Sequence, residues 1–543
     1  MATSSKTTFP FSLSETFRGG RRTYWSAGPP LLLVVVSSVV AISILLPLAY
    51  LLLRAAGAGD ELWRLLLRPR SAVILFNSVA LASAVTFSTI AIAVPLAWLV
   101  VRSDLPLRRL WTGLLIVPLA VPSYVGGFVL IGALGPRGML QRLLEPLGVE
   151  RLPEIYGFPG AWLALTLFTY PYVFLVVRAA LQGMDRTLEE ASRSLGQSGW
   201  TTFWRVTLPQ LRPAMAAGGL LVALYTLSDF GAVSLLQFDT FTRVIYVHYQ
   251  GSFDRHLAAG LALVLVCMTL LILVLEHWSR GRAHYHSGTG KGARSPRRVS
   301  LGRWRLPAFL LCASIVLFAL VMPALTVSYW LLRSVALTAN FSALPGLAWN
   351  SLWVSAAAGI AAVVLAVPVA YLTVRFPRRL TKPFEYAIYL GYGLPGIVIA
   401  LSLVFFGANV APFIYQTFFL LIAAYLIRFL PQAYGNARTS LLQVQPSLEE
   451  ASRSLGRSWH GTLRTITLPL VRGGATAGGI LVFVTTLKEL PITLLLGPIG
   501  FKTLATEVWS LTAEGFFADA APVIFVLLSV SLLPTLLFVG KEP

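Results

Sequence analysis

Long apolar runs constrain this chain more than any other feature of its sequence. A helix that crosses about 30 Å of hydrocarbon needs about 20 predominantly apolar residues. Charged residues make up 12% of the chain, against about 25% in a typical soluble protein. We count twelve runs of sufficient length, near residues 30–53, 77–101, 111–134, 160–177, 213–237, 257–276, 306–332, 350–374, 384–407, 411–430, 473–497 and 520–539. The sequence therefore predicts an all-α integral membrane protein with about 12 transmembrane helices in the lipid bilayer.

The basic residues predict the orientation of these spans. The net charge is +21, and most of the 43 lysine and arginine residues fall between spans on one side if the N-terminus is placed in the cytoplasm. Cytoplasmic loops of membrane proteins collect such residues, so we expect both termini to be cytoplasmic. The same scattering between spans argues against nucleic acid as a partner. The first run is too long for a signal-peptide core, and we interpret it as a retained anchor.

An internal repeat divides the chain into two halves. The sequence EEASRSLG stands at residues 189–196 and again at 449–456, and landmarks before it recur at a spacing that is 13 residues longer. The difference indicates an insertion near 135–159. Because six spans return the chain to its starting side, the halves are predicted to be parallel six-helix repeats. The predicted segments are a cytoplasmic N-terminal tail (1–29), a first repeat of six spans (30–278), a basic flexible cytoplasmic linker (279–305) and a second repeat of six spans (306–543).

The repeated octapeptide predicts a short capped helix on the cytoplasmic side. Thr187 and Ser447 are candidate N-caps, with Glu190 and Glu450 three positions later in capping boxes. Gly196 supplies a C-terminal glycine. A helix of two turns is unstable alone in water. Either it packs on neighbouring helix ends of its own chain, or the two copies dock into grooves of a two-fold partner.

This loop resembles the EAA loop of permeases in binding-protein-dependent ABC importers. The pattern E-A-x-x-x-x-G is followed at a fixed distance by hydrophobic-x-Leu-Pro in both halves, although serine replaces the second alanine of the family pattern. The resemblance implies a fused type I importer permease with coupling helices near 187–196 and 447–456. The residues it assigns to ATPase coupling are Glu189, Glu190, Ala191, Leu195, Gly196 and Pro209, and Glu449, Glu450, Ala451, Leu455, Gly456 and Pro469.

The same resemblance implies the partners of the chain. ATP and Mg would be bound by two separate ABC ATPase subunits, so this chain is expected to be no enzyme and to hold no cofactor. A periplasmic or extracellular binding protein would deliver the solute at a bacterial inner membrane. A secondary transporter driven by an ion gradient is the rival class, but it has no use for two identical docking helices.

Segments after the EAA loops resemble those of ferric-iron permeases. They include residues 227–236, 487–491 and 503–506. Thiamine and phosphonate permeases share the fused architecture, so these two solutes remain alternatives. Ferric iron is a hard cation that prefers oxygen donors. The sequence thus favours ferric iron imported by alternating access, with a thiamine or phosphonate importer as the second interpretation.

Two acidic residues at matching positions are candidates for the substrate pathway. Asp229 and Glu489 lie one in each half, inside predicted spans where buried acids are costly. They either line the pathway, or serve the structure, with Glu489 paired to a basic group such as Lys488 and Asp229 bonded to a helix terminus.

The external loop 238–256 carries a second group of candidates. It holds Tyr246, His248, Tyr249 and Asp254, which either dock the binding protein or pass iron onward. No cysteine or histidine cluster has the spacing of a closed metal site, so no stored metal is predicted.

Overall fold

The computed structural model describes residues 28–57, 64, 67–136, 138–149, 151–185, 187–251, 255–280, 299–336, 341–377 and 381–539. Within these ranges every regular element is a helix, and the one β-type contact is an isolated bridge between Ser103 and Val299. The predicted all-α class is confirmed. The N-terminal tail lies almost entirely outside the described residues.

The first half of the chain contains twelve described α-helices and three short turns. They are α1 (Leu31–Gly57), α3 (Pro69–Arg102), α4 (Arg108–Ile116), η1 (Val117–Ala120), α5 (Ser123–Leu134), α6 (Met139–Leu144), η2 (Glu145–Leu147), α7 (Phe158–Gly183), α8 (Thr187–Ser194), α9 (Gly199–Thr202), η3 (Phe203–Thr207), α10 (Leu208–Ser228), α11 (Gly231–Leu235), α12 (Phe241–Gly251) and α13 (Arg255–Arg280).

The second half repeats this order. Its described elements are η4 (Gly302–Trp304), α14 (Arg305–Val316), η5 (Leu317–Val321), α15 (Met322–Ala336), α16 (Leu344–Arg375), α17 (Lys382–Gly393), α18 (Gly396–Asn409), η6 (Pro412–Ile414), α19 (Phe418–Gln443), α20 (Pro446–Ser454), α21 (Trp459–Thr462), η7 (Leu463–Thr467), α22 (Leu468–Leu487), α23 (Pro491–Leu496), α24 (Leu504–Ala513) and α25 (Phe517–Val539).

Nine of the described helices are long and apolar enough to cross a bilayer, or eleven if two bent pairs each count as one span. The bends of 97° and 106° lie between η1 and α5 and between α17 and α18. Pro122 and Pro395 stand at these breaks, and proline cannot donate the backbone hydrogen bond that a continuous helix needs. The apolar runs near 111–134 and 384–407 are therefore not single straight helices, as their length alone suggested.

Two further predicted spans are shorter than expected. We expected continuous helices over 213–237 and 473–497, but α10 ends at Ser228 and α22 ends at Leu487. The chain then turns and starts the short helices α11 and α23. Each break places one of the two matched acidic residues in a non-helical linker, where its side chain can bond to free backbone N–H groups.

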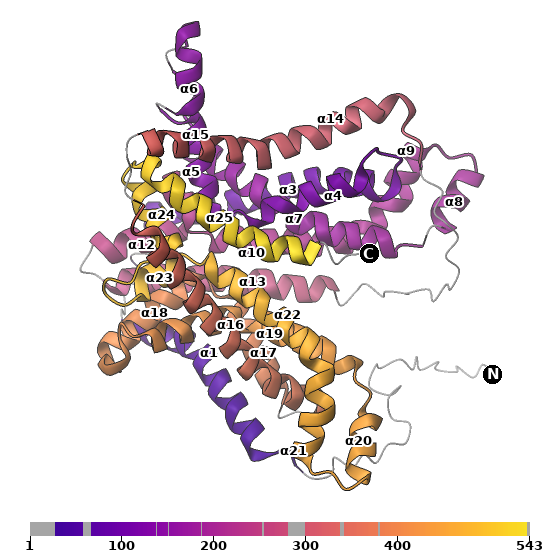
Figure 1. Cartoon of the computed structure of the whole chain (residues 1–543), viewed down its shortest axis with the longest axis vertical. Helices are drawn as coiled ribbons and strands as arrows, with labels where there is room; N and C mark the ends of the chain where they lie inside the picture. Colours follow the sequence, from indigo (N-terminus) through magenta and orange to yellow (C-terminus); the bar gives the residue numbers. More distant parts are fainter. Residues whose placement is uncertain are drawn as a thin grey trace, which may run out of the picture.

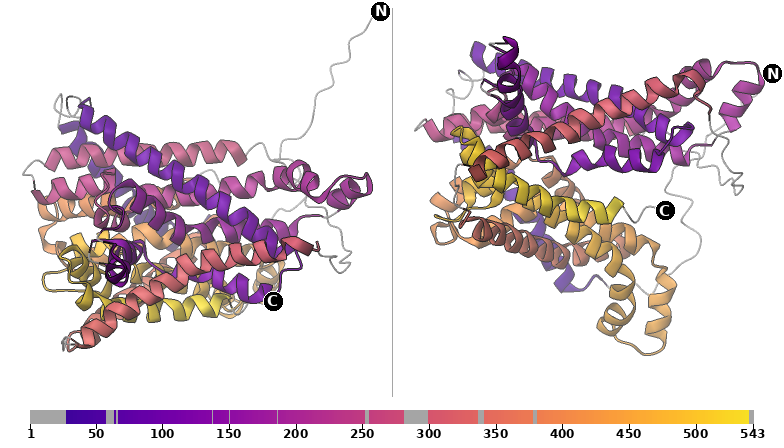
Figure 2. Two further views of the ribbon diagram at one scale, coloured as in Figure 1. Left: turned by 90° about the horizontal axis from the view of Figure 1, so that it is seen from above. Right: turned by 45° about the horizontal axis from the view of Figure 1, so that its top comes forward.

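The two halves exchange helices at their edges. Helix α1, from the first half, packs against α16 and α17 of the second half, whereas α14 and α15 pack against α4 and α5 of the first (Figure 1). The apolar clusters record the exchange, because Ile44 and Leu51 are buried among second-half residues and Cys312 among first-half residues. The two further views show the same interleaving (Figure 2). The repeat boundary near 279–305 is thus a boundary in sequence and not in packing.

The predicted insertion and external loop both contain helices. Helix α6 lies within the insertion near 135–159 and projects from the bundle in Figure 1. The segment 238–256, expected to be a loop, is largely the helix α12. Of the predicted linker, residues 281–298 lie outside the described part, but Val299 is held by backbone hydrogen bonds to Arg102 and Asp104.

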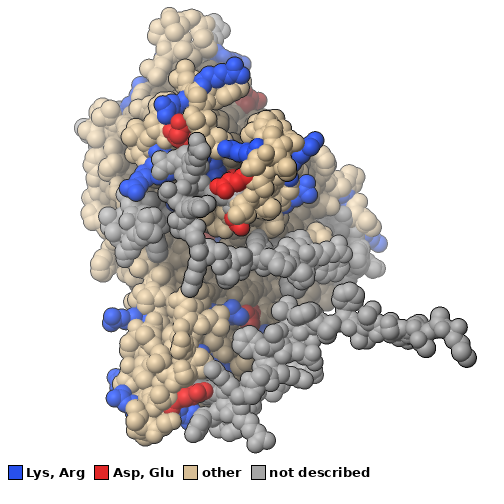
Figure 3. Space-filling model, turned by 90° about the vertical axis from the view of Figure 1, so that its right-hand side faces the viewer, with Lys and Arg blue, Asp and Glu red and all other residues tan. Residues whose placement is uncertain are grey.

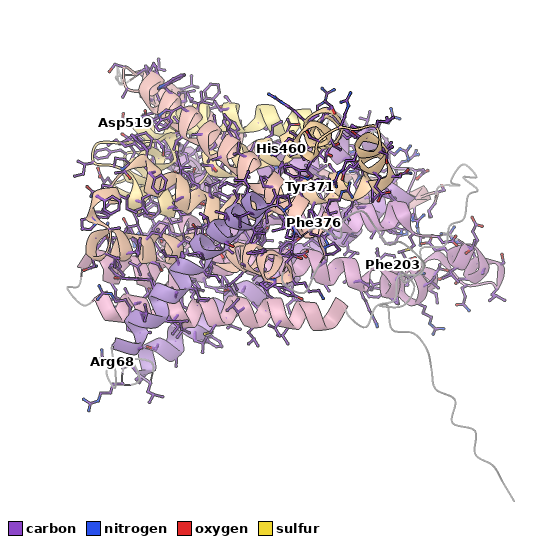
Figure 4. All side chains as sticks on the ribbon, turned by 90° about the horizontal axis from the view of Figure 1, so that it is seen from below. Arg68, Phe203, Tyr371, Phe376, His460 and Asp519 are labelled. Carbon is purple, nitrogen blue, oxygen red and sulfur yellow. The ribbon has the colours of Figure 1, made fainter. Side chains whose placement is uncertain are left out.

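The molecule has two distinct ends. Helices α8 and α20 lie at one end, and α6, α12 and α24 lie at the other (Figure 1). Side chains labelled in Figure 4 mark the same polarity, with Phe203 toward the end that carries α8 and with Arg68 and Asp519 at the opposite end. Helix α1 begins at the α20 end, because Leu33 packs with Tyr371 and Val444.

Candidate coupling face and interior cavity

Helices α8 and α20 terminate in the same way. Gly196 and Gly456 have φ angles of 81° and 84°, in the left-handed region that favours glycine. The amide of Gly196 donates to the carbonyl of Arg193 at 2.9 Å, and the next amide, of Gln197, donates to Ser192 at 3.2 Å. The second copy repeats both bonds. This is a Schellman ending, and it satisfies carbonyls that the last helical turn leaves free.

The N-terminal ends do not form the expected capping boxes. Thr187 is the first residue of α8 itself, and its amide donates to the Asp185 carboxylate at 3.0 Å. Helix α20 begins one residue before Ser447, at Pro446, and its N-cap Gln445 makes no side-chain capping bond. Proline suits the first helical position because its missing N–H would have no partner there, so α20 starts without a capping box.

Glu449 is a buried anchor. We expected it on the ATPase-coupling surface, but its side chain is 0% exposed. It accepts hydrogen bonds from Arg375 at 3.0–3.2 Å, from Thr467 at 3.0 Å and from Tyr371 at 3.4 Å. Arg375 also donates to the carbonyl of Val444, just before α20. The carboxylate therefore ties α20 to the last turn of α16 and to the start of α22.

Glu189 makes the equivalent contacts more loosely. Its carboxylate accepts a hydrogen bond from Thr207 at 2.9 Å and lies 3.7 Å from the guanidinium of Arg102. It is 16% exposed. The first half has Trp98 where the second has Tyr371, so no phenol reaches this carboxylate. The recurrence of Arg102 and Arg375, and of Thr207 and Thr467, was visible in the sequence, but nothing there connected these residues to the glutamates.

The outward side of both helices is exposed and partly apolar. Leu195 and Leu455 are 81% and 85% exposed, and Leu188 and Leu448 are exposed as well. Ala191, Ala451 and Glu190 also lie on the surface, while Glu450 is half-buried. Figure 3 faces this end of the molecule and shows lysine and arginine side chains on both of its halves, with fewer acidic ones. This pattern suits docking into an apolar groove of another protein.

A π-helical turn follows both α8 and α20. It spans η3 in the first half and η7 in the second, directly before Leu208-Pro209 and Leu468-Pro469. Proline in a continuing helix removes a backbone hydrogen bond, and a π turn lets the helix absorb that loss. Thr207 and Thr467 end these turns and contact Glu189 and Glu449. Pro209 and Pro469 therefore shape the support of the coupling helices.

A cavity of about 270 Å³ lies between the two halves. Its walls consist largely of residues at matching positions of the repeat, as expected of a cavity on a two-fold axis. The matching pairs are Phe168 and Arg428, Tyr172 and Gln432, Tyr225 and Thr485, Ser228 and Lys488, Asp229 and Glu489, Phe230 and Leu490, Gly231 and Pro491, and Leu119 and Tyr392. Both acidic candidates thus line one cavity, as the pathway interpretation requires.

Asp229 is also bonded to the helix that follows it. Its carboxylate accepts hydrogen bonds from the amides of Ala232 and Val233, at 3.0 and 3.4 Å, at the start of α11. Ser123, at the start of α5, hydrogen-bonds to the same carboxylate. These contacts fit the structural interpretation, in which Asp229 bonds to a nearby helix terminus. Its place in the cavity wall fits the pathway interpretation.

Glu489 pairs with Arg428 and not with Lys488. The Arg428 guanidinium lies 3.1 Å from the Glu489 carboxylate, which also accepts from the amide of Ile492 at 3.3 Å. A Cβ atom on Gly396 would lie 1.6 Å from the guanidinium, so a larger residue there would force the Arg428 side chain to shift. Lys488 instead donates to the carbonyl of Leu119, in the other half, at 3.2 Å.

The candidates for docking or iron transfer lie at the opposite end of the molecule. The Tyr246 ring packs on Phe230 with centroids 4.8 Å apart, and its hydroxyl accepts from Gln250 at 2.7 Å. Tyr249 packs beside Phe405, and His248 is half-buried. Asp254 lies outside the described residues. In the described part of the chain, no three His, Cys, Asp or Glu residues cluster closely enough to hold a metal ion.

Comparison with known proteins decides the family. Residues 90–282 and 359–539 match the family described as the inner membrane component of binding-protein-dependent transport systems. The chain belongs to this family. The two matches fall in the two halves, so the predicted tandem permease is confirmed, as is a multi-pass protein of the inner membrane.

Individual relatives carry more specific names. The permease is 35% identical to an Fe(3+)-transport system permease protein of Haemophilus influenzae, over 94% of this chain and 98% of the relative. It is 28% identical to a ferric transport system permease protein of Actinobacillus pleuropneumoniae, over 75% of this chain and 62% of that relative. A molybdenum transport system permease protein of Escherichia coli is 30% identical over 40% of this chain and 97% of its own length. The last relative corresponds to a single half.

Proposed function

We propose that this permease moves ferric iron across the bacterial inner membrane in an importer driven by two separate ATPase subunits. A binding protein delivers the ion on the outer side, and alternating access carries it through the cavity between the halves. The observation that carries the proposal is the pair of anchored helices α8 and α20, which expose apolar residues at the same end of the molecule. The name of the relative matched over 98% of its length, and that of a second, partly matched relative, support iron as the solute.

The coupling step follows from how these helices are held. Glu189 and Glu449 attach α8 and α20 to α3 and α16, the long helices of each half. A displacement of α8 or α20 by a closing ATPase dimer is thereby transmitted to a helix that reaches the opposite end. The Lys and Arg residues in the loops around these helices support a cytoplasmic location for this end, and we propose that both termini lie on the same side.

Substitution of the exposed leucines tests the docking surface. Leu195→Asp combined with Leu455→Asp puts a charge into an apolar groove and should abolish co-purification of the ATPase subunits. Leu147→Asp is the matched control, because Leu147 is 76% exposed and follows α6, at the other end of the molecule. Retention of the ATPases by the double variant would contradict the assignment of this face.

The solute is tested with the reconstituted complex. ATPase activity is measured with the binding protein loaded with Fe³⁺, thiamine, a phosphonate or molybdate, or left empty. Stimulation by the iron-loaded form alone is the expected result. Stimulation by another loaded form, with no response to iron, would keep the importer and replace the solute.

A further inference from the structure

The two walls of the cavity differ in chemistry although their backbones match. The first half contributes the hydroxyl groups of Ser123, Tyr172 and Tyr225, and the second half contributes those of Tyr392 and Thr485. At the positions that match Phe168 and Ser228, the second half contributes the cations Arg428 and Lys488. One side of the cavity is therefore rich in hydroxyl groups, and the other side is basic.

The carboxylates do not make this cavity a cation trap. Asp229 is compensated by the amides at the start of α11, and Glu489 by Arg428. With Arg428 and Lys488 opposite Asp229 and Glu489, the formal charge of the four groups cancels. A bare trivalent cation would meet an ammonium group that has no carboxylate partner among the described contacts, and like charges repel strongly in a medium of low dielectric constant.

The hydroxyl-rich wall nevertheless offers donors that suit a hard cation. The rings of Tyr172 and Tyr225 lie with centroids 5.7 Å apart and at an interplanar angle of 41°. Ser123 hydrogen-bonds to both Tyr225 and Asp229, which joins the phenol and the carboxylate in one group. The Tyr124 side chain is 2% exposed, and its hydroxyl has no partner among the described residues.

The basic wall suits an anion. The Lys488 ammonium has three donors, and its hydrogen bond to the Leu119 carbonyl uses one of them. Hydrogen bonds from an ammonium to an oxyanion are charge-assisted and stronger than neutral ones. The volume of about 270 Å³ lies just below the range of about 300–1,000 Å³ usual for small-molecule sites, which favours a compact ligand.

We propose that iron occupies this cavity as a ferric complex that keeps a small oxyanion ligand, with the metal on the Tyr172, Tyr225 and Asp229 wall and the oxyanion on Lys488. This inference rests on the proposed function. Each phenol that coordinates the metal loses its proton to water as the O–H bond breaks and the Fe–O bond forms, and the iron remains Fe³⁺. Both walls are needed, because the Tyr172, Tyr225 and Asp229 group comes from the first half and Lys488 from the second.

Visible absorption tests the metal side directly. A phenolate bound to Fe³⁺ gives a charge-transfer band, so ferric nitrilotriacetate added to the permease–ATPase complex in nanodiscs should produce one. Tyr172→Phe with Tyr225→Phe should lose the band. Tyr386→Phe should keep it, because Tyr386 is an exposed tyrosine outside the cavity. A band that survives the double substitution, or is absent from the unaltered protein, would overturn the proposal.

Lys488→Met tests the anion side. Loss of one charge-assisted hydrogen bond, worth about 1.5–3 kcal/mol, should weaken ferric nitrilotriacetate binding about tenfold or more while leaving the band position unchanged. Unchanged affinity for ferric nitrilotriacetate would contradict the role of Lys488 in binding the anion.

Thermal unfolding followed by tryptophan fluorescence checks that each variant is folded. If the double tyrosine variant is not folded, the single Tyr225→Phe variant replaces it. ATPase activity that is stimulated by iron without a charge-transfer band would contradict only this inference. ATPase activity that does not respond to iron would contradict the proposed function.

Discussion

Glu189 and Glu449 occupy the same position of the repeat, yet their surroundings differ. Glu449 is fully buried and accepts from Arg375, Thr467 and Tyr371. Glu189 is partly exposed and lies 3.7 Å from Arg102. Removal of one partner from a buried ion pair leaves an uncompensated charge, at a cost of about 3–5 kcal/mol. Helix α20 is thus held more strongly than α8.

Glu449→Gln should therefore destabilise the permease more than Glu189→Gln. Both variants keep the shape of the side chain and remove its charge, so each serves as the control for the other. The midpoint of thermal unfolding in detergent, followed by tryptophan fluorescence, measures the difference. Equal losses for the two variants would mean that the tighter contacts of Glu449 carry no extra stability.

A second prediction at the scale of single residues concerns Gly396. A Cβ atom there would lie 1.6 Å from the Arg428 guanidinium and 2.8 Å from the Glu489 carboxylate, so the pair in the cavity wall must move. Gly396→Ala should cost about 1–3 kcal/mol, as overpacked sites do. Gly435→Ala is the control, because nothing lies within 4 Å of a Cβ atom at that helical position and alanine favours helices. Equal unfolding midpoints would show that the pair tolerates the shift.

At the scale of elements, the Schellman endings set the direction in which the chain leaves α8 and α20. A β-branched residue at Gly196 or Gly456 is strained in the left-handed region, by about 1–2 kcal/mol at each site. The space around both positions is open, since nothing lies within 4 Å of a Cβ atom. The effect of substitution is therefore confined to the backbone of these two turns.

Gly456→Val should leave the permease in the membrane and remove the stimulation of ATPase activity by loaded binding protein. Gly456→Asn should retain most of the stimulation, because asparagine tolerates left-handed geometry. Transport assays in proteoliposomes and membrane abundance measure the two effects separately. Normal coupling in the valine variant would show that the direction of this turn is unimportant.

At the scale of the whole molecule, the exchange of edge helices joins the halves. Helix α1 buries Ile44 and Leu51 against second-half residues, and α14 buries Cys312 against the first half. Between helices in a membrane such contacts stabilise the assembly through van der Waals packing, since lipid is as apolar as these side chains. The covalent connection through 281–298 is then unnecessary for assembly.

A protease site placed within 281–298 tests this. After cleavage the halves should co-purify in mild detergent and keep iron-stimulated ATPase activity at the level of the uncut protein. Separation of the fragments would show that the exchanged helices hold too little interface. The control is the protein without the inserted site, treated with the same protease.

The sequence alone determined the class, the number of apolar runs and the repeat, because hydropathy and self-similarity are properties of local segments. It also determined the left-handed glycines Gly196 and Gly456, since a helix end is specified by its neighbours. It failed on the capping boxes and on the straightness of four spans, where Pro446, Pro122 and Pro395 or an acidic residue changed the local hydrogen bonding.

Only the tertiary structure decided the partners of the charged groups. Arg102, Arg375 and Arg428 lie far in sequence from the carboxylates they meet, and the repeat gives equivalent positions without saying which of them face each other. The helix exchange, the buried state of Glu449 and the two unlike walls of the cavity likewise depend on contacts between segments distant in the chain. Hydropathy sorts such residues into the membrane or out of it, but packing alone selects their neighbours.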